Sequence, residues 1–147
     1  MATAREIRAT ELEALRTLYR QLHPDDPPLE SIQLRDRFER LLADPSIVIV
    51  VVEHEAQLVG TCQLSIVPNL ARDGRPFGVI ENVITHEAYR NQGFGRLCLS
   101  HAIAIAEERY CYKIQLQTGT DQEWKRQFYE SCGFDRHEKT GFVKRLD

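Results

Sequence analysis

The residues best suited to chemistry lie in one short segment, Arg90-Asn91-Gln92-Gly93-Phe94-Gly95-Arg96. An apolar run precedes this segment and a long amphipathic pattern follows it, which predicts a loop between a strand and a helix. Glycines let backbone N–H groups approach a phosphate closely, and the positive end of a helix dipole favours negative charge there. The segment therefore predicts a binding site for a phosphorylated ligand.

Two common nucleotide-binding loops do not fit this segment. A dinucleotide-binding turn of the Rossmann type has a third glycine, where this chain has Cys98. A Walker A loop ends in Gly-Lys-Ser or Gly-Lys-Thr, and the chain has no such ending. The sequence thus argues against dinucleotide binding of the Rossmann type and against nucleotide hydrolysis.

Glu81 is a candidate general base. It lies within the apolar run Val79-Ile80-Glu81-Asn82-Val83-Ile84, where partial burial would raise the pKa of a carboxyl group toward useful base strength. A structural carboxylate paired with a basic group or a cap is an equally good interpretation. The sequence leaves both open.

The N-terminal third predicts a strand and two helices that would support these residues. We expect a short strand at 6–9, and then a helix that starts with a capping box formed by Thr10 and Glu13. A second helix is expected from about 30 to 43, with Pro45 just beyond its end.

The rest of the chain alternates strands with helices. The β-branched run 47–52 predicts a strand buried on both faces, followed by antiparallel strands at 58–67 and 77–85 with a turn at Asp73-Gly74. A helix at 93–109, a strand at 112–118, a helix at 122–132 ended by Gly133, and one or two strands within 134–146 complete the pattern. The fold class is mixed α/β in a single domain, 1–147.

Composition narrows the function classes. A formal charge of −3 and a pI near 6.0 argue against nucleic-acid binding, which needs a concentrated basic face. The polar N-terminus does not resemble a signal peptide, and no apolar run approaches the roughly 20 residues of a membrane span, so we expect a cytoplasmic protein with no membrane partner. The four cysteines show no zinc-like spacing, so we expect no metal. We expect these cysteines to be reduced and mostly buried, and a catalytic role for one of them is the minor alternative.

Arg90-x-x-Gly93-x-Gly95, together with the later Tyr129-x-x-x-Gly133-Phe134, resembles the motifs of the GCN5-related N-acetyltransferases, the GNAT superfamily. The expected order of strands and helices is similar to that of this family over nearly the whole chain. The resemblance implies a mostly antiparallel sheet with one parallel strand pair, flanked by helices. It also implies acetyl-CoA as the co-substrate and no metal.

The resemblance further implies how acetyl-CoA is held. The pyrophosphate would contact the backbone of the glycine loop and the side chain of Arg90 or Arg96, while the pantetheine arm would bond to the backbone of the preceding strand. The cofactor-binding residues expected on this basis are Val83, Ile84, Thr85, Arg90, Gln92, Gly93, Phe94, Gly95 and Arg96.

Acetyl transfer needs a neutral amine, a polarised carbonyl and a proton for the departing thiolate. The resemblance assigns Tyr129 as the acid, although a core tyrosine is the alternative. It assigns the Val83 N–H as the carbonyl donor, provided that the strand carries a β-bulge. Glu81 would act as base directly or through a water. The glucosamine-6-phosphate acetyltransferases carry a comparable acidic residue.

The acceptor is less well defined. In the superfamily, the regions matching 23–29 and 70–77 line the acceptor pocket, so Asp25 and Asp26 could attract an amine while Arg72 and Arg75 could bind an anionic group. Solvated loops are the alternative. We expect transfer to a primary amine of a small molecule by direct attack in a ternary complex. The alternatives are acetylation of a protein N-terminus or lysine, and a non-catalytic acyl-CoA sensor. The resemblance also allows a homodimer.

Overall fold

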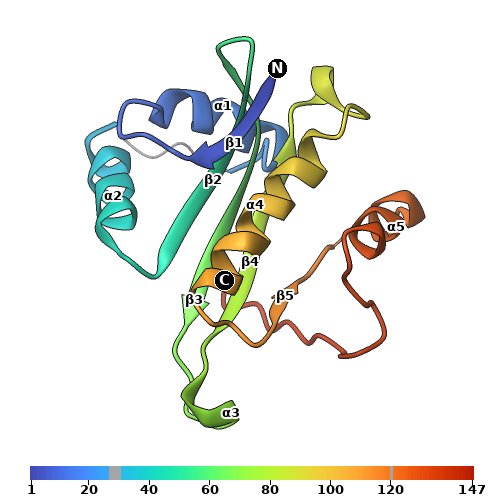
Figure 1. Ribbon diagram of the computed structural model, residues 1–147. Coiled ribbons are helices and arrows are strands. Elements are labelled where there is room, and N and C mark those ends of the chain that lie inside the picture. Colours follow the sequence, from blue (N-terminus) through green and yellow to red (C-terminus); the bar gives the residue numbers. More distant parts are fainter. Residues whose placement is uncertain (27–30, 120) are drawn as a thin grey trace.

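The computed structural model describes residues 1–26, 31–119 and 121–147. Its centre is a five-stranded sheet in which spatial order follows chain order (Figure 1). The first four strands are antiparallel neighbours, and the last two run parallel. This topology confirms the predicted mixed α/β class with one parallel pair. The strands are β1 (Ala2–Glu6), β2 (Ile47–His54), β3 (Gln57–Val67), β4 (Phe77–Thr85) and β5 (Ile114–Leu116).

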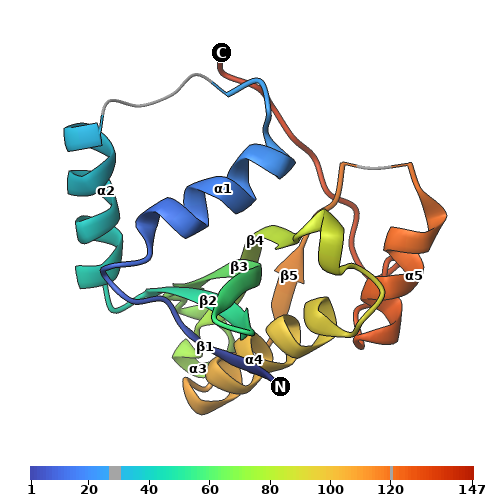
Figure 2. The ribbon, with the colours of Figure 1, turned by 90° about the horizontal axis from the view of Figure 1, so that it is seen from above.

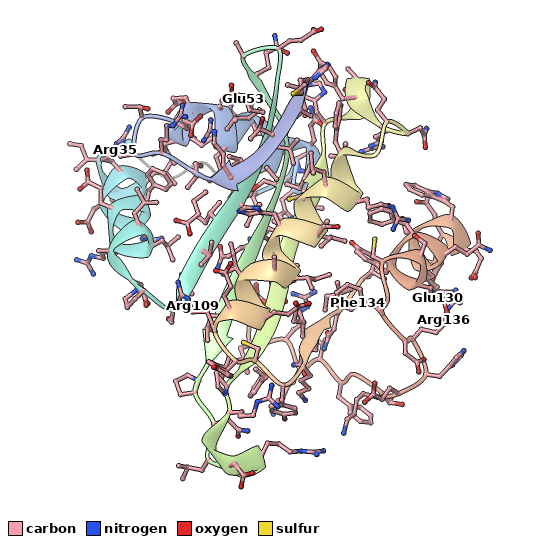
Figure 3. All side chains as sticks on the ribbon, viewed as in Figure 1. Arg35, Glu53, Arg109, Glu130, Phe134 and Arg136 are labelled. Atoms are coloured by element: carbon pink, nitrogen blue, oxygen red, sulfur yellow. The ribbon has the colours of Figure 1, made fainter. Side chains whose placement is uncertain are left out.

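Helices cover both faces of the sheet (Figure 2). The helices α1 (Leu12–Leu22) and α2 (Ser31–Ala43) lie on one face, and α4 (Phe94–Glu108) lies on the other. The helix α5 (Glu123–Ser131) lies beyond β5, and two short helices, α3 (Ala71–Gly74) and η1 (Glu87–Tyr89), flank β4 in the chain. Arg109, at the end of α4, donates a hydrogen bond of 2.6 Å to the Pro45 carbonyl just before β2 (Figure 3).

The strand β2 shows why its sequence is continuously apolar. Val48, Val50 and Val52 belong to the core under α4, while Ile49 and Val51 belong to the core under α1 and α2. Because successive side chains of a strand point to opposite faces, a central strand between two helical layers needs apolar residues at every position. The prediction of a strand buried on both faces is confirmed.

The start of the chain differs from expectation. The first strand lies at 2–6 instead of 6–9, and Thr10 and Glu13 form no capping box. Glu11 is the N-cap residue, but its side chain does not cap the helix. Its carboxylate accepts the Arg8 N–H at 2.7 Å and binds Arg5 through two hydrogen bonds of 2.9 and 2.7 Å, so it holds the segment between β1 and α1.

The expected final strands are wrong. After Leu116 the described residues form no further strand, and 138–147 follow an irregular course. The apolar side chains of Phe142, Val143 and Leu146 are exposed there, because the segment has no neighbouring strand to pair with. The predicted turn at Asp73-Gly74 is present as part of the short α3. The predicted start of the second helix, near Glu30, lies outside the described residues. In the part of the chain that is described, no helix has the length and apolar character needed to cross a bilayer.

Candidate functional site

The two parallel strands separate and open a cleft. The pairing of β4 with β5 ends at Ile80 opposite Leu116, but β4 continues to Thr85. A cleft of about 1280 Å³ lies along the unpaired part of β4. It is lined by parts of β4, the glycine loop, the end of α1, the segment after β5, α5 and the C-terminal segment. Its lining residues are Gln21, Leu22, His23, Ile80, Glu81, Asn82, Val83, Ile84, Thr85, Arg90, Asn91, Gly93, Phe94, Gly95, Arg96, Gln117, Thr118, Gly119, Trp124, Lys125, Phe128, Tyr129, Val143 and Arg145.

A β-bulge lies in β4 at this opening. The register with β3 pairs Thr61 with Ile84 and Gln63 with Glu81, so the single residue Cys62 faces two residues, Asn82 and Val83. Asn82 has a left-handed conformation, with φ of 55°, which asparagine adopts more readily than most residues. An extra residue at a bulge leaves the regular ladder and re-aims its neighbours. The β-bulge that was the condition for assigning the Val83 N–H as the carbonyl donor is therefore present.

The glycine loop forms the N-terminus of α4. Gly93 caps the helix with φ of 84°, and the first intrahelical bond runs from the Leu97 N–H to the Gly93 carbonyl at 3.0 Å. The N–H groups of Phe94, Gly95 and Arg96 precede that bond and therefore have no partner within the helix. These N–H groups and the helix dipole together suit a phosphate group without a metal.

Gly95 is needed for a close approach. A Cβ atom at this position would lie 3.1 Å from the Phe128 ring and 3.2 Å from Thr85 Oγ1. Any side chain there would fill the space where the end of β4, α5 and the helix N-terminus meet. The loop thus presents bare backbone to the cleft, as a pyrophosphate group requires.

The two arginines of the loop already have protein partners. Arg96 donates to the Ser131 carbonyl at 3.0 Å and to the Ser131 hydroxyl at 2.6 Å, which ties α4 to α5. The Arg90 Nε donates to the Thr85 carbonyl at 3.4 Å, so its terminal nitrogens are the freer cationic group of the loop. Gln92 does not line the cleft, although its neighbours do.

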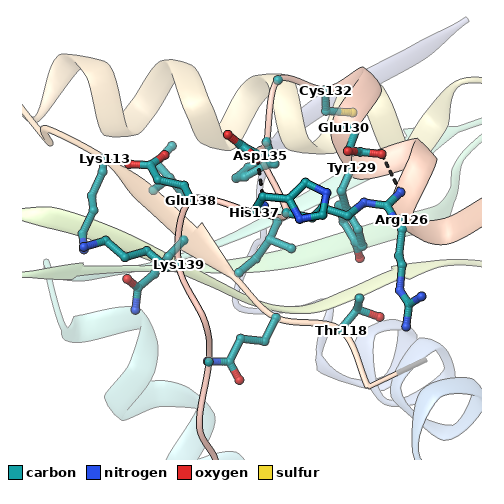
Figure 4. Close-up of a pocket in the computed structure, with 18 of the residues that line it drawn as sticks. Lys113, Thr118, Arg126, Tyr129, Glu130, Cys132, Asp135, His137, Glu138 and Lys139 are labelled. Atoms are coloured by element: carbon teal, nitrogen blue, oxygen red, sulfur yellow. Dashed lines mark hydrogen bonds and ion pairs between the residues drawn. The ribbon is translucent and has the colours of Figure 1, made fainter. Parts of the chain in front are cut away.

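Tyr129 is half-buried on the side of the cleft formed by α5. Its ring contacts those of Phe128 and Phe134, at centroid distances of 5.4 and 6.4 Å. Burial raises the pKa of the Tyr129 phenol above its ordinary value of 10.0, and Cys132 and Cys62 raise it further. The phenol therefore holds its proton at neutral pH. Tyr129 also borders a second pocket, which lies between β5 and the C-terminal segment (Figure 4).

Glu81 lines the cleft, but the expected partial burial is wrong. Its neighbour Ile80 is buried against α4, so Glu81 points to the opposite face of the sheet, where its side chain is exposed. The sequence suggested burial because the run is apolar on both sides of Glu81. This position is open because β4 runs past the end of β5 and because α1 ends at Leu22, beside the cleft.

The four acceptor candidates do not reach the cleft. Arg72 and Arg75 lie in and just after α3, at the other end of β4 (Figure 1). Arg75 donates to the carbonyls of Tyr110 and Cys111 at 3.0 and 3.2 Å, and Arg72 lies 5.4 Å from the Tyr112 ring centroid. Asp25 and Asp26 do not line the cleft either.

Of the expected acceptor region 23–29, His23 lines the cleft. Gln21 near the end of α1 lines it too, and the C-terminal segment contributes Val143 and Arg145. Trp124 also lines the cleft and is 53% exposed. Trp124 lies one helical turn before Phe128, which also lines the cleft, and this spacing could have indicated its position. No local pattern marks Val143 or Arg145, because their placement depends on the path of an irregular segment.

A helix N-terminus suited to phosphate, beside a bulged strand at the opening between two parallel strands, defines an acyl-CoA-dependent transferase. The sequence model described as the Acetyltransferase (GNAT) family matches residues 12–134. The chain therefore belongs to the GNAT family, and it is an acetyl-CoA-dependent N-acetyltransferase. No group of three or more potential metal ligands occurs among the described residues.

Individual proteins agree with this assignment. The chain is 32% identical to the glucosamine 6-phosphate N-acetyltransferase of Trypanosoma brucei brucei over 115 residues, which cover 77% of this chain and 76% of that protein. A solved structure named as an acetyltransferase, from Agrobacterium tumefaciens str. C58, is 42% identical with a TM-score of 0.92 and covers 98% of this chain and 99% of that one. An aminoglycoside N-acetyltransferase solved with CoA shares the fold, with a TM-score of 0.82 at 17% identity over 100% of this chain and 96% of that one.

Proposed function

We propose that this protein transfers the acetyl group of acetyl-CoA to a primary amine of a small molecule, by direct attack in a ternary complex. The observation that carries the proposal is the composition of the cleft. A carboxylate, a bulged backbone amide, a protonated phenol and a phosphate-binding helix N-terminus line the same cavity. Direct transfer needs both substrates in one cavity at once, and the cleft of about 1280 Å³ offers that space.

The binding half of the site is assigned to backbone groups. The N–H groups of Phe94, Gly95 and Arg96 would hold the pyrophosphate, with Arg90 adding charge. Val83, Ile84 and Thr85 lie where β4 has no partner on the β5 side. The backbone groups of this stretch that point away from β3 would bond to a pantetheine arm as to a neighbouring strand, and the Thr85 carbonyl, which now accepts from Arg90, would have to exchange that partner.

Three groups would carry the chemistry. Glu81 accepts the proton of the attacking amine, directly or through a water, and its exposure to the cleft makes it reachable by an acceptor. The Val83 N–H donates to the thioester carbonyl as negative charge develops on it. As the C–N bond forms and the C–S bond breaks, Tyr129 gives its proton to the departing sulfur.

A small acceptor is supported by the relatives. The Trypanosoma brucei brucei protein is named for an amino sugar phosphate, and the CoA-bound structure is that of an aminoglycoside enzyme. The end of α1 and the C-terminal segment border the cleft opposite the glycine loop, so the acceptor would enter between them.

The test is an amine panel in which release of free CoA is measured as new thiol. The panel contains amino sugars with and without a phosphate, aminoglycosides, polyamines, and peptides with a free N-terminus or lysine. We expect turnover with at least one small amine and intersecting initial-velocity lines when both substrates are varied. Parallel lines would refute direct transfer. Turnover with peptides alone would favour protein acetylation, and CoA binding without any turnover would favour a sensor.

A further inference from the structure

The helix α5 carries Tyr129 and lies at the periphery of the fold (Figure 2). All nine of its residues are described, and none of them is fully buried. The end of the helix is well defined, because Gly133 follows it with φ of 100° and the Phe134 N–H donates to the Tyr129 carbonyl at 3.2 Å. A proton donor on such a helix depends on specific contacts for its position.

Arg96, the third residue of α4, connects α4 with α5. Its two terminal nitrogens donate to a single residue, to the Ser131 carbonyl at 3.0 Å and to the Ser131 hydroxyl at 2.6 Å. The same hydroxyl donates to the Phe128 carbonyl at 2.6 Å, so it is itself held on the helix. The last carbonyls of a helix have no partner within it and lie at the negative end of the dipole, so a guanidinium is favoured there.

A second contact lies one turn earlier on α5. The Phe128 ring lies so close to Gly95 that a Cβ atom on this glycine would be 3.1 Å from it. Phe128 and Ser131 are three residues apart, so they share the face of α5 that meets the first turn of α4. Apolar packing is not directional, whereas the hydrogen bonds from Arg96 are, and together these contacts fix the rotation of α5 about its axis. Tyr129 follows Phe128 by about 100° around the helix, so the same contacts fix its direction.

The backbone and the side chain of Arg96 therefore have different tasks. The Arg96 N–H is one of the donors at the start of α4 that we assign to the pyrophosphate. The guanidinium is bound to Ser131 instead, and Arg90 is the freer cation of the glycine loop.

We propose that Arg96 is, through its side chain, a positioning residue for acetyl transfer: its hydrogen bonds to Ser131 tie the end of α5 to the start of α4 and so hold Tyr129 in the cleft. The loop that binds the pyrophosphate would then also place the proton donor. This inference rests on the proposed function for its kinetic consequence. Its structural consequence concerns the protein without ligand, so the two can fail separately.

The test compares Arg96→Met with Arg136→Met. The Arg136 guanidinium also bonds to α5, to Glu123 at 2.7 and 3.2 Å and to Glu130 at 2.5 Å (Figure 3). Because Arg136 lies in the segment after α5 and outside the cleft lining, its loss is a matched control. A misplacement of about 1 Å can cost about 10²-fold in rate. We expect Arg96→Met to lower kcat about tenfold with a Kd for CoA within about threefold of that of the unsubstituted protein, and Arg136→Met to leave kcat unchanged.

Two double variants test whether Arg96 acts through Ser131 and Tyr129. Tyr129→Phe has already lost the proton donor, so adding Arg96→Met to it should lower kcat no further. Ser131→Ala removes only the hydroxyl acceptor, so it should cost less than Arg96→Met, and the two changes together should cost no more than Arg96→Met alone. In the protein without ligand, hydrogen exchange of the peptide 123–134 should be faster in Arg96→Met, while exchange of the peptide 47–54 should not change.

Several outcomes would overturn the proposal. An unchanged kcat with a Kd for CoA raised about tenfold or more would show that the Arg96 side chain binds phosphate instead. An equal loss of kcat in Arg136→Met, a loss that multiplies with that of Tyr129→Phe, or exchange that is unchanged or faster in both peptides would also contradict it. If the unsubstituted protein transfers no acetyl group, the proposed function fails, while the exchange comparison still decides whether Arg96 holds α5.

Discussion

Gly95 offers the sharpest test of the phosphate loop. Substituting valine would place a Cβ atom 3.1 Å from the Phe128 ring and 3.2 Å from Thr85 Oγ1, with two further methyl groups beyond it. The first turn of α4 would have to move away from the end of β4, and its free N–H groups would move with it. A hydrogen bond to a charged group contributes about 1.5–3 kcal/mol, and losing one corresponds to roughly a 10- to 150-fold weaker Kd. We expect Gly95→Val to weaken CoA binding by at least about 10-fold.

The assay is isothermal titration with CoA, and the control is Gly93→Ala. Gly93 has φ of 84° but no atom within 4 Å of an added Cβ, so alanine meets strain without a steric clash. A left-handed alanine costs about 1–2 kcal/mol, which should lower the melting temperature by roughly 2–8 °C. Gly93→Ala should therefore affect stability more than affinity, and Gly95→Ala should fall between wild type and valine in affinity. If Gly95→Val remains folded and binds CoA within threefold of the unsubstituted protein, the loop does not hold the pyrophosphate.

Three further predictions concern proton transfer and charge. Tyr129→Phe should lower kcat about 10- to 100-fold at an unchanged Kd for CoA. Burial raises the pKa of the Tyr129 phenol, so the loss of rate that follows its deprotonation in the unsubstituted enzyme should begin only above pH 10. Glu81→Gln should slow turnover at pH 7 by about 10²-fold. Part of this defect should disappear at pH 9 to 10, because more of the acceptor amine is already neutral there. An equal defect at both pH values would contradict the role of Glu81 as a general base. The hydrogen bonds from Arg5 lower the pKa of Glu11 below its ordinary value of 4.5. The Arg5–Glu11 pair therefore stabilises the folded state fully above pH 4.5, and this stabilisation is lost as the pH falls through the lowered pKa of Glu11. Thermal melts from pH 7 to pH 3 should therefore fall less steeply for Glu11→Gln than for the unsubstituted protein, and identical slopes would refute the link.

The glycine loop, 90–96, could be predicted because its signal is local. A left-handed Gly93, a second glycine that admits no side chain, and an amphipathic helix after them lie within a few residues of one another. The apolar run of β2 is similarly self-contained, since burial on both faces shows directly in residue type. Patterns of this kind predicted the helix N-terminus and the central strands.

The bulge depends on the register of β3 with β4, and the cleft depends on the divergence of β4 from β5. Asn82 and Val83 face a single residue of β3, and no propensity in either strand marks that mismatch. The resemblance to the GNAT family suggested the bulge, while the residue types of β4 were only compatible with one. The exposure of Glu81 likewise follows from β4 running past the end of β5, a matter of relative strand length that the two segments do not encode separately.

The sequence by itself determined the glycine loop at the start of a helix, the mixed α/β class and the candidate proton-transfer groups, because each rests on residues close together in the chain. Tertiary structure alone decided which distant segments face those groups. It placed Arg72 and Arg75 at the far end of the sheet and brought Val143 and Arg145 to the cleft. The physical reason is that an acceptor site is assembled from segments separated by many residues, whose meeting depends on strand register, loop path and helix packing together.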